Sequence, residues 1–221
     1  DNSTVNVRTS LVDNGLITLQ TIGGAGNASR LICDSPAITI GGTGTIRQSE
    51  FFLYSNKDRE AVNSCRELGR QFPEVTGWIR AVKSDFKLAR EMGLPETGIL
   101  VSCSDYHIFL KLRKTRKQAM EQYLDIVKAA LDTGIRPRCH FEDITRADFY
   151  GFVVPFAIEL MKLGDSYGIE VKIRLCDTMG YAVPWPNAEL PRSLPKLVHG
   201  LVHGLGYGLG AMLPEVGGMS Y

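Results

Sequence analysis

Hydrophobic and polar positions alternate regularly along this chain from Ile46 onward. Short apolar runs, typical of strands, are followed by longer segments whose apolar residues recur every three or four positions, as in helices. The predicted strands cover residues 46–54, 75–81, 97–104, 135–143 and 169–178. The predicted helices cover residues 58–70, 85–92, 107–132, 148–163 and 194–205.

Strands that alternate with helices indicate an α/β fold built from parallel βαβ units with right-handed crossovers. Both an open doubly wound sheet and a (β/α)8 barrel, the TIM barrel, fit this order. A complete barrel needs eight units and roughly 250 residues. About five units are predicted here, which would leave a barrel without its first strand and its last two strands.

The two ends of the chain differ from this pattern. Residues 1–45 are rich in Gly, Ser, Thr and Asn, have no helical period and carry almost no charge. We therefore expect an atypical stretch at residues 1–41, a partial barrel at residues 42–206 and an atypical tail at residues 207–221. The abrupt change at both ends leads us to expect a truncated gene or a shifted reading frame there.

Composition excludes several classes of protein. The chain has 221 residues, of which 44% are hydrophobic, enough for one sizeable core. Lys+Arg (25) nearly balance Asp+Glu (24), which gives no nucleic-acid or membrane footprint. No apolar run is long enough to span a membrane, and residues 1–10 have neither the basic nor the apolar region of a secretory signal, so we do not expect one there. Five cysteines without a CxxC spacing predict a reducing, cytoplasmic location.

Charged and polar residues gather where each predicted strand ends, whereas the apolar parts of the same strands carry no such cluster. The carboxyl ends of parallel strands converge on one edge of the fold, so these residues are expected to form a site. Arginines there suit a carboxylate substrate, and carboxylates with a histidine suit proton transfer. The set comprises Ser49, Glu50, Arg80, Ser102, Ser104, His107, Glu142, Asp143, Arg146, Asp177 and Thr178.

Several segments resemble a known family of enzymes. The strings IRQSEFFLYS, VTGWIRAVKSDFKLA, SCSDYHIFLKLRKTRKQA, CHFEDITRAD and IRLCDTMGYAVP are similar to the 2-isopropylmalate synthase/homocitrate synthase family. Its catalytic part is the HMG-CoA lyase-like, or pyruvate carboxyltransferase, domain. Within the family, the segment FEDITRADFYGFVVPF looks closest to the Re-citrate synthase branch.

The resemblance implies an incomplete TIM barrel and an acyltransferase that condenses acetyl-CoA with a 2-oxo acid. It implies a divalent metal, Mg²⁺ or Mn²⁺, that polarises the ketone, and a homodimer. The family positions imply catalytic roles for Glu142, His107 and Thr178. They imply substrate-binding roles for Glu50, Arg80, Ser104, Arg146 and Asp177.

Two family elements find no counterpart in the sequence. The family's first strand ends in D-T-T-x-R-D-G and its seventh supplies H-x-H, and neither motif occurs here, so we assign no metal ligand. Two other readings stay open, a non-catalytic partial barrel kept for binding or regulation and an HMG-CoA lyase-like lyase. Oxaloacetate is the first choice among 2-oxo acids. Arg80, Arg138 and Arg146 are candidates for a second substrate carboxylate.

Overall fold

A computed structural model describes the backbone of residues 4–7, 10–12, 30–33, 39–41, 48–204 and 215–216, and side chains between residues 48 and 202. The chain forms two compact units, Asp1–Arg47 with Ser220–Tyr221, and Gln48–Met219. In the first unit β1 (Thr4–Val7) pairs in parallel with β3 (Arg30–Cys33), and β2 (Ser10–Val12) pairs in parallel with β4 (Thr39–Gly41). The domain boundaries at residues 41 and 206 stay predictions.

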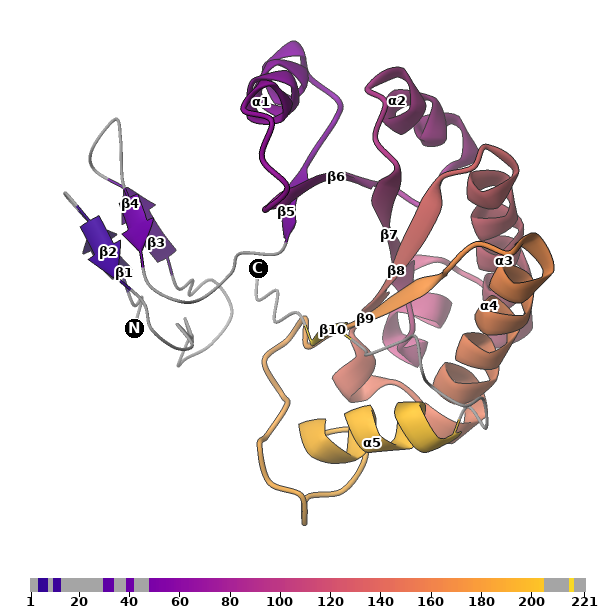
Figure 1. The fold of residues 1–221 in the computed structure, drawn as a ribbon. Helices are drawn as coiled ribbons and strands as arrows, with labels where there is room; N and C mark the ends of the chain where they lie inside the picture. The colour runs from indigo at the N-terminus through magenta and orange to yellow at the C-terminus, as the bar shows by residue number, and fades with distance from the viewer. Residues whose placement is uncertain are drawn as a thin grey trace. The chain divides into compact units, whose positions relative to one another are not determined.

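The second unit is built on one parallel sheet whose strand order follows the chain, β10-β9-β8-β7-β6-β5 (Figure 1). Its strands are β5 (Gln48–Phe51), β6 (Glu74–Ile79), β7 (Glu96–Ser102), β8 (Arg136–Glu142), β9 (Lys172–Cys176) and β10 (Glu215–Val216). Its helices are α1 (Asn56–Glu67), α2 (Phe86–Glu91), α3 (Arg116–Asp132), α4 (Val154–Tyr167) and α5 (Leu194–Gly204).

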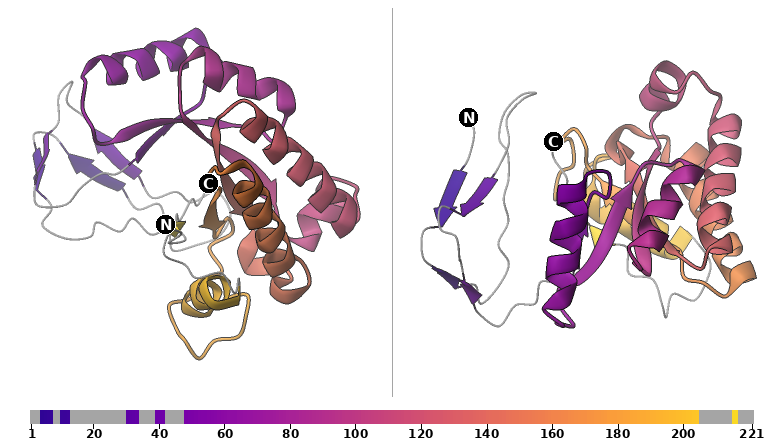
Figure 2. Two further views of the ribbon diagram at one scale, coloured as in Figure 1. Left: turned by 45° about the vertical axis from the view of Figure 1, so that its right-hand side comes forward. Right: turned by 90° about the horizontal axis from the view of Figure 1, so that it is seen from above.

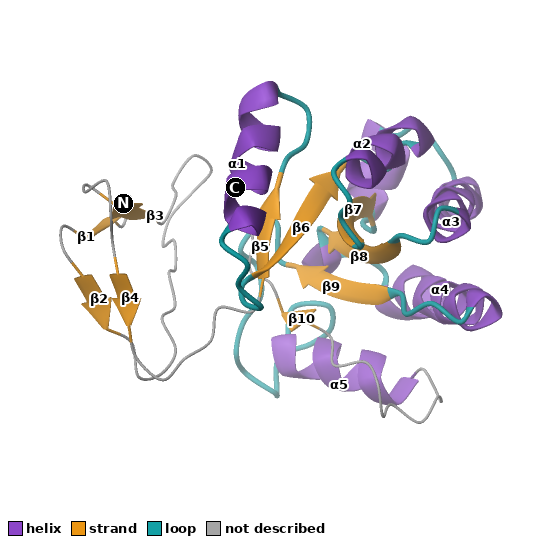
Figure 3. Cartoon of the chain, turned by 45° about the horizontal axis from the view of Figure 1, so that its top comes forward, coloured by secondary structure: helices purple, strands orange, loops and turns teal. Residues whose placement is uncertain are grey.

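The sheet curves, and the helices that connect its strands lie on its outer side (Figures 2 and 3). Every strand pair in it is parallel, as expected for βαβ units. The prediction of an α/β fold that forms an incomplete (β/α)8 barrel is confirmed. The short strand β10 adds a parallel pairing to β9 within the tail that we expected to be atypical.

Alternate residues along each strand explain why the helices pack on the outer side. Ile79, Ile99, Val101 and Phe141 are fully buried and point toward the helices. The ring of Phe141 stacks on Phe156 of α4, with the ring centroids 5.2 Å apart. Burying each such side chain contributes about 1.5–3 kcal/mol, so the outer layer supplies the core that holds the strands in place.

The prediction of one long helix over residues 107–132 is wrong, because the structure has two separate helical segments there. A π-helix spans Tyr106–Lys111, and α3 begins only at Arg116. Arg113 lies in the left-handed region (φ 57°), which ends the first helical segment. Thr115 then caps α3, since its side chain accepts from the Gln118 N–H while the Gln118 side chain accepts from the Thr115 N–H.

The helix predicted at residues 148–163 is likewise longer and differently built. A π-helix at Phe149–Val153 runs into α4 (Val154–Tyr167), and the helix ends at Gly168, not at Gly164. Gly168 takes the left-handed conformation (φ 62°) that suits a helix C-terminus. Gly164 lies inside the helix, and its small size is needed there, because a Cβ would lie 2.8 Å from the Ile169 carbonyl oxygen.

None of the helices in the described ranges combines the length and the apolar character needed to cross a bilayer.

Candidate functional site

A histidine and two carboxylates meet at the carboxyl ends of β7 and β8. His107 Nδ1 lies 3.2 Å from a Glu142 carboxylate oxygen, and His107 Nε2 lies 3.8 Å from Asp143. The Ser102 hydroxyl donates to Glu142 at 2.5 Å, and the Lys111 ammonium donates to it at 3.2 Å. The Glu142 side chain is 10% exposed, so it keeps access to a ligand on this edge of the sheet.

Asp143 links the remaining polar groups of this cluster. Its carboxylate accepts from the Ser104 hydroxyl at 2.5 Å and from two nitrogens of Arg146, of which Nη2 is 2.6 Å away. Its backbone N–H donates to the Thr178 hydroxyl oxygen at 2.8 Å. The guanidinium of Arg146 also lies over the ring of Tyr106, 4.6 Å from the centroid. Thr178 and Arg146 are therefore fixed relative to His107 through one aspartate.

Local backbone geometry brings these side chains together. The π-helix after β7 presents His107 and Lys111 four residues apart, so both reach Glu142. Asp143 follows β8 in the left-handed conformation (φ 63°), which is uncommon outside glycine, although aspartate adopts it more readily than most residues. Such strain at a strand end is typical of functional sites, where the surroundings enforce the conformation.

Five of the eight predicted site residues lie in this carboxyl-edge cluster: His107, Glu142, Thr178, Ser104 and Arg146. Asp177 is adjacent, but its carboxylate accepts from the Thr145 hydroxyl and from the backbone N–H groups of Tyr181 and Ala182. This places Asp177 as the residue that shapes the loop after β9.

Arg80 is turned toward its own loop. Its guanidinium forms a two-point contact with Asp85, at 2.9 and 3.1 Å, and lies over the ring of Tyr54. The Arg80 side chain is 66% exposed. The Asp85 carboxylate raises the pKa of Arg80 further, so this arginine stays charged. Within the described side chains, no contact joins Arg80 to the carboxyl-edge cluster.

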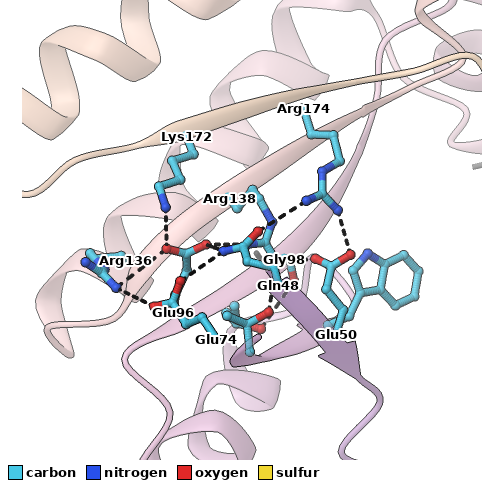
Figure 4. A network of polar contacts seen from close by, with 12 residues as sticks. Gln48, Glu50, Glu74, Glu96, Gly98, Arg136, Arg138, Lys172 and Arg174 are labelled. Carbon is cyan, nitrogen blue, oxygen red and sulfur yellow. Dashed lines mark hydrogen bonds and ion pairs between the residues drawn. The ribbon is translucent and has the colours of Figure 1, made fainter. Parts of the chain in front are cut away.

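Glu50 belongs to a second group, a charged network on the inner face of the sheet (Figure 4). The expectation that the strands carry a cluster of charged and polar residues only at their ends is wrong. Glu50 pairs with Arg138 and, at 2.6 Å, with Arg174. The inner-face network also includes Gln48, Glu74, Thr76, Glu96, Arg136, His140 and Lys172.

Sequence reasoning missed most of this network because it read each strand only at its end. The signal was the two-residue period of β8, where Arg136, Arg138, His140 and Glu142 alternate with apolar neighbours. Alternate residues share one face of a strand, so all four point to the inner side. Barrel interiors are usually filled by branched apolar side chains, so the charged residues on this inner face mark a departure from ordinary core packing.

The network keeps its carboxylates ionised. Burial opposes ionisation of Glu50, but the hydrogen bond with His140 and the charges of Arg138 and Arg174 outweigh it and lower its pKa to about 2. Burial also disfavours the charged form of His140, and for an imidazole this lowers the pKa. The indole N–H of Trp78 donates to His140 Nδ1 at 3.4 Å, and His140 Nε2 lies 3.4 Å from both Arg138 Nε and a Glu50 oxygen.

The described side chains do not fit a divalent metal. Within residues 48–202 no three His, Cys, Asp or Glu side chains are grouped so that they could hold an ion. The oxygens of Glu142 face Lys111, and those of Asp143 face Arg146, so cations of the protein already neutralise them.

The sequence places this chain in a known family. A family model described as HMGL-like matches residues 50–203, which include the carboxyl-edge cluster and all of the inner-face network except Gln48. The chain belongs to the HMGL-like family. The predicted resemblance to the HMG-CoA lyase-like domain of the synthases is thereby confirmed.

Relatives within the HMGL-like family include two named citrate (Re)-synthases. The protein from Syntrophus aciditrophicus is 68% identical over 154 residues, which cover 70% of this chain and 24% of the relative. The protein from Clostridium kluyveri is 61% identical over 152 residues, which cover 69% of this chain and 34% of the relative. A 2-phosphinomethylmalate synthase from Streptomyces hygroscopicus is 42% identical over 173 residues, or 76% of this chain and 39% of the relative.

The HMGL-like chain thus spans between about a quarter and two-fifths of the length of these curated relatives. Among solved structures, the HMG-CoA lyase from Brucella melitensis matches with a TM-score of 0.45 and 16% identity, over 70% of this chain and 52% of that one.

Gly98 allows the inner-face network to close, and replacing it gives a direct test. A Cβ at this position would lie 2.6 Å from Trp78 Cδ1, 2.8 Å from His140 Nε2 and 3.3 Å from a Glu50 oxygen. We expect Gly98→Ala to lower the free energy of unfolding by about 1–3 kcal/mol, because the ring and imidazole must shift. Urea unfolding would measure this, with Ser64→Ala on the exposed face of α1 as the control; equal stabilities would refute the tight packing.

Proposed function

We propose that this chain is the central part of an acyltransferase that condenses acetyl-CoA with a 2-oxo acid, with oxaloacetate as the first-choice acid and citrate as the product. The observation that carries the proposal is the 68% identity to a protein named citrate (Re)-synthase over 154 residues. The matched family region, residues 50–203, includes every residue of the carboxyl-edge cluster. The proposed reaction forms a bond between the acetyl methyl carbon and the ketone carbon, and water then releases the CoA thiol.

In this reaction Glu142 takes a proton from the methyl group of acetyl-CoA. The Ser102 hydroxyl and the Lys111 ammonium orient its carboxylate by donating to it. His107, 3.2 Å from Glu142 and 3.8 Å from Asp143, is placed to give a proton to the ketone oxygen as the new bond forms. This pairing of a carboxylate with an imidazole supports an acid–base role for the cluster.

Thr178 supports the substrate side of the proposal, whereas the Ser104 hydroxyl donates to Asp143 and would act on the substrate through it. The Thr178 oxygen accepts from the Asp143 N–H, which leaves its own O–H to donate to a substrate oxygen. Arg146 supplies charge at the same edge of the sheet, and Arg80 would have to leave Asp85 to reach the substrate, while Glu50 and Arg138 lie deeper on the inner face. In the family a divalent metal would polarise the ketone, but the described residues do not fit one, so no step above depends on it.

The test is release of free thiol by the purified chain. Acetyl-CoA, Mg²⁺ or Mn²⁺ and one 2-oxo acid at a time (oxaloacetate, 2-oxoisovalerate, pyruvate or 2-oxoglutarate) would be supplied. We expect thiol release that is fastest with oxaloacetate. The proposal fails if no acid supports release and if calorimetry detects no binding of acetyl-CoA.

We also propose a cytoplasmic location and a homodimer. Cys65, Cys103, Cys139 and Cys176 are all free thiols, which supports a reducing compartment. The homodimer rests on the family resemblance alone. Size-exclusion chromatography with light scattering would test it, and a monomeric mass at micromolar concentration would contradict it.

A further inference from the structure

Arg138 is a fully enclosed guanidinium that joins two carboxylates from different strands (Figure 4). One of its terminal nitrogens contacts Glu96 of β7 and donates to the Gln48 side-chain oxygen at 2.8 Å. The other contacts Glu50 of β5 and donates to the Thr76 hydroxyl at 3.1 Å. Both ends of the planar group are therefore engaged, so its orientation is fixed from two sides.

Glu50 is the partner of Arg138 that keeps some exposed surface. One of its oxygens meets Arg138 and lies 3.4 Å from His140, while the other accepts from Arg174 at 2.6 Å. The Glu50 side chain is 14% exposed, whereas Arg138 and Glu96 are completely buried. Of these three side chains, Glu50 alone is therefore open to a ligand on the inner face of the sheet.

We propose that Arg138 is a positioning residue that acts through Glu50: braced by Glu96 and Gln48, it fixes the direction of the Glu50 carboxylate. This inference rests on the proposed function in one respect, namely that Glu50 contacts the 2-oxo acid. The geometric part, that Arg138 orients and ionises Glu50, does not depend on catalysis and is tested separately below.

The chemistry requires an arginine at this point. The guanidinium is planar and offers donors on two edges, so it spans Glu96 and Glu50 at once. A lysine ammonium is a point charge that reaches one carboxylate well and leaves the other short of a partner. A lysine would thus keep the charge of the network and lose the bridge between β7 and β5.

The first experiment follows the carboxyl carbon of Glu50 by NMR during a pH titration of the whole chain, with Glu50→Gln used to assign its signal. In the unsubstituted chain we expect a pKa near 2. Arg138→Gln should raise it by about one unit or more, and Arg138→Lys by a smaller amount. Arg136→Gln is the matched control, because Arg136 lies on the same strand and pairs with Glu74 and Glu96 but not with Glu50.

The second experiment measures the Michaelis constants of the same variants in the thiol-release assay. We expect Arg138→Lys to raise KM for the 2-oxo acid about tenfold and to leave KM for acetyl-CoA unchanged, a split that general loosening of the fold would not produce. An ordinary Glu50 pKa in the unsubstituted chain, or an equal shift in Arg136→Gln, would overturn the positioning role. If Glu50 shifts as expected but no acid is condensed, the proposed function fails and the positioning role stands.

Discussion

Replacing Glu96 with glutamine should lower the free energy of unfolding of this chain by about 3–5 kcal/mol, because the change removes one partner of a buried ion pair. Glu96 is completely buried and contacts Arg138, and its second oxygen accepts from Lys172 at 2.9 Å. Glutamine keeps the shape of the side chain and loses its charge, so the enclosed Arg138 guanidinium is left with a single carboxylate, that of Glu50. Chemical denaturation at neutral pH would measure the loss.

The control is Glu74→Gln on the same network. Glu74 is 32% exposed and pairs with Arg136 at 3.0 Å, so solvent screens it and we expect a loss below about 1 kcal/mol. Similar losses for the two variants would contradict the assignment of Glu96 as the buried anchor. A double replacement of Glu96 and Arg138 by methionine should recover part of the stability, since it removes the enclosed guanidinium together with its partner. Lys172 then loses Glu96 but is 25% exposed, and Glu50 keeps Arg174.

Acid should narrow the difference between Glu96→Gln and the unsubstituted chain. Burial opposes ionisation of Glu96, but the hydrogen bond from Lys172 and the charge of Arg138 outweigh it and lower its pKa below the ordinary 4.5. A carboxyl whose pKa folding lowers contributes stability above the unfolded pKa and loses that contribution as the pH falls through the folded pKa. The two chains should therefore converge below about pH 4.5, where the unfolded state takes up the proton first.

The sequence was sufficient to predict the βα order, because each helix carries one apolar face and each strand a short apolar run. It failed where single residues end a helix. The apolar period continues across residues 107–132, yet Arg113 adopts a left-handed conformation and Thr115 starts a new helix. Gly164 looked like a helix end, but α4 continues through it, and the Ile169 carbonyl lies so close that a Cβ would not fit there. Such choices depend on tertiary contacts that periodicity does not contain.

The candidate site was predicted in outline for a similar reason. Strand ends converge, so His107, Glu142 and Thr178 were expected to lie close together, and the structure joins all three through Glu142 and Asp143. Arg80 also follows a strand, but Asp85, five residues later, holds its guanidinium. A position at a strand end predicts that a residue lies at the carboxyl edge of the sheet. Which partner a long side chain binds there depends on the neighbouring loops.

Replacing Glu142 with glutamine should reduce the rate of condensation by about 10²–10⁴-fold, because an amide cannot accept the methyl proton of acetyl-CoA. The amide can still accept from Ser102, so the fold and the Michaelis constants should change little. Steady-state thiol release would measure the loss. The control is Glu159→Gln on α4, where the side chain is 44% exposed and pairs with Lys162, and we expect its activity to match that of the unsubstituted chain.

Exchange of the acetyl-CoA methyl protons with deuterated solvent gives the same test without condensation. If Glu142 is the base, the unsubstituted chain should exchange these protons and Glu142→Gln should not, whichever 2-oxo acid the enzyme uses. His107→Gln distinguishes the role of His107 from that of Glu142, which lies 3.2 Å away. As the proposed proton donor to the ketone, His107 should be dispensable for exchange and needed for condensation. Exchange lost equally in both variants would assign the methyl proton to the pair rather than to Glu142, and exchange retained in Glu142→Gln would remove this glutamate from the base role.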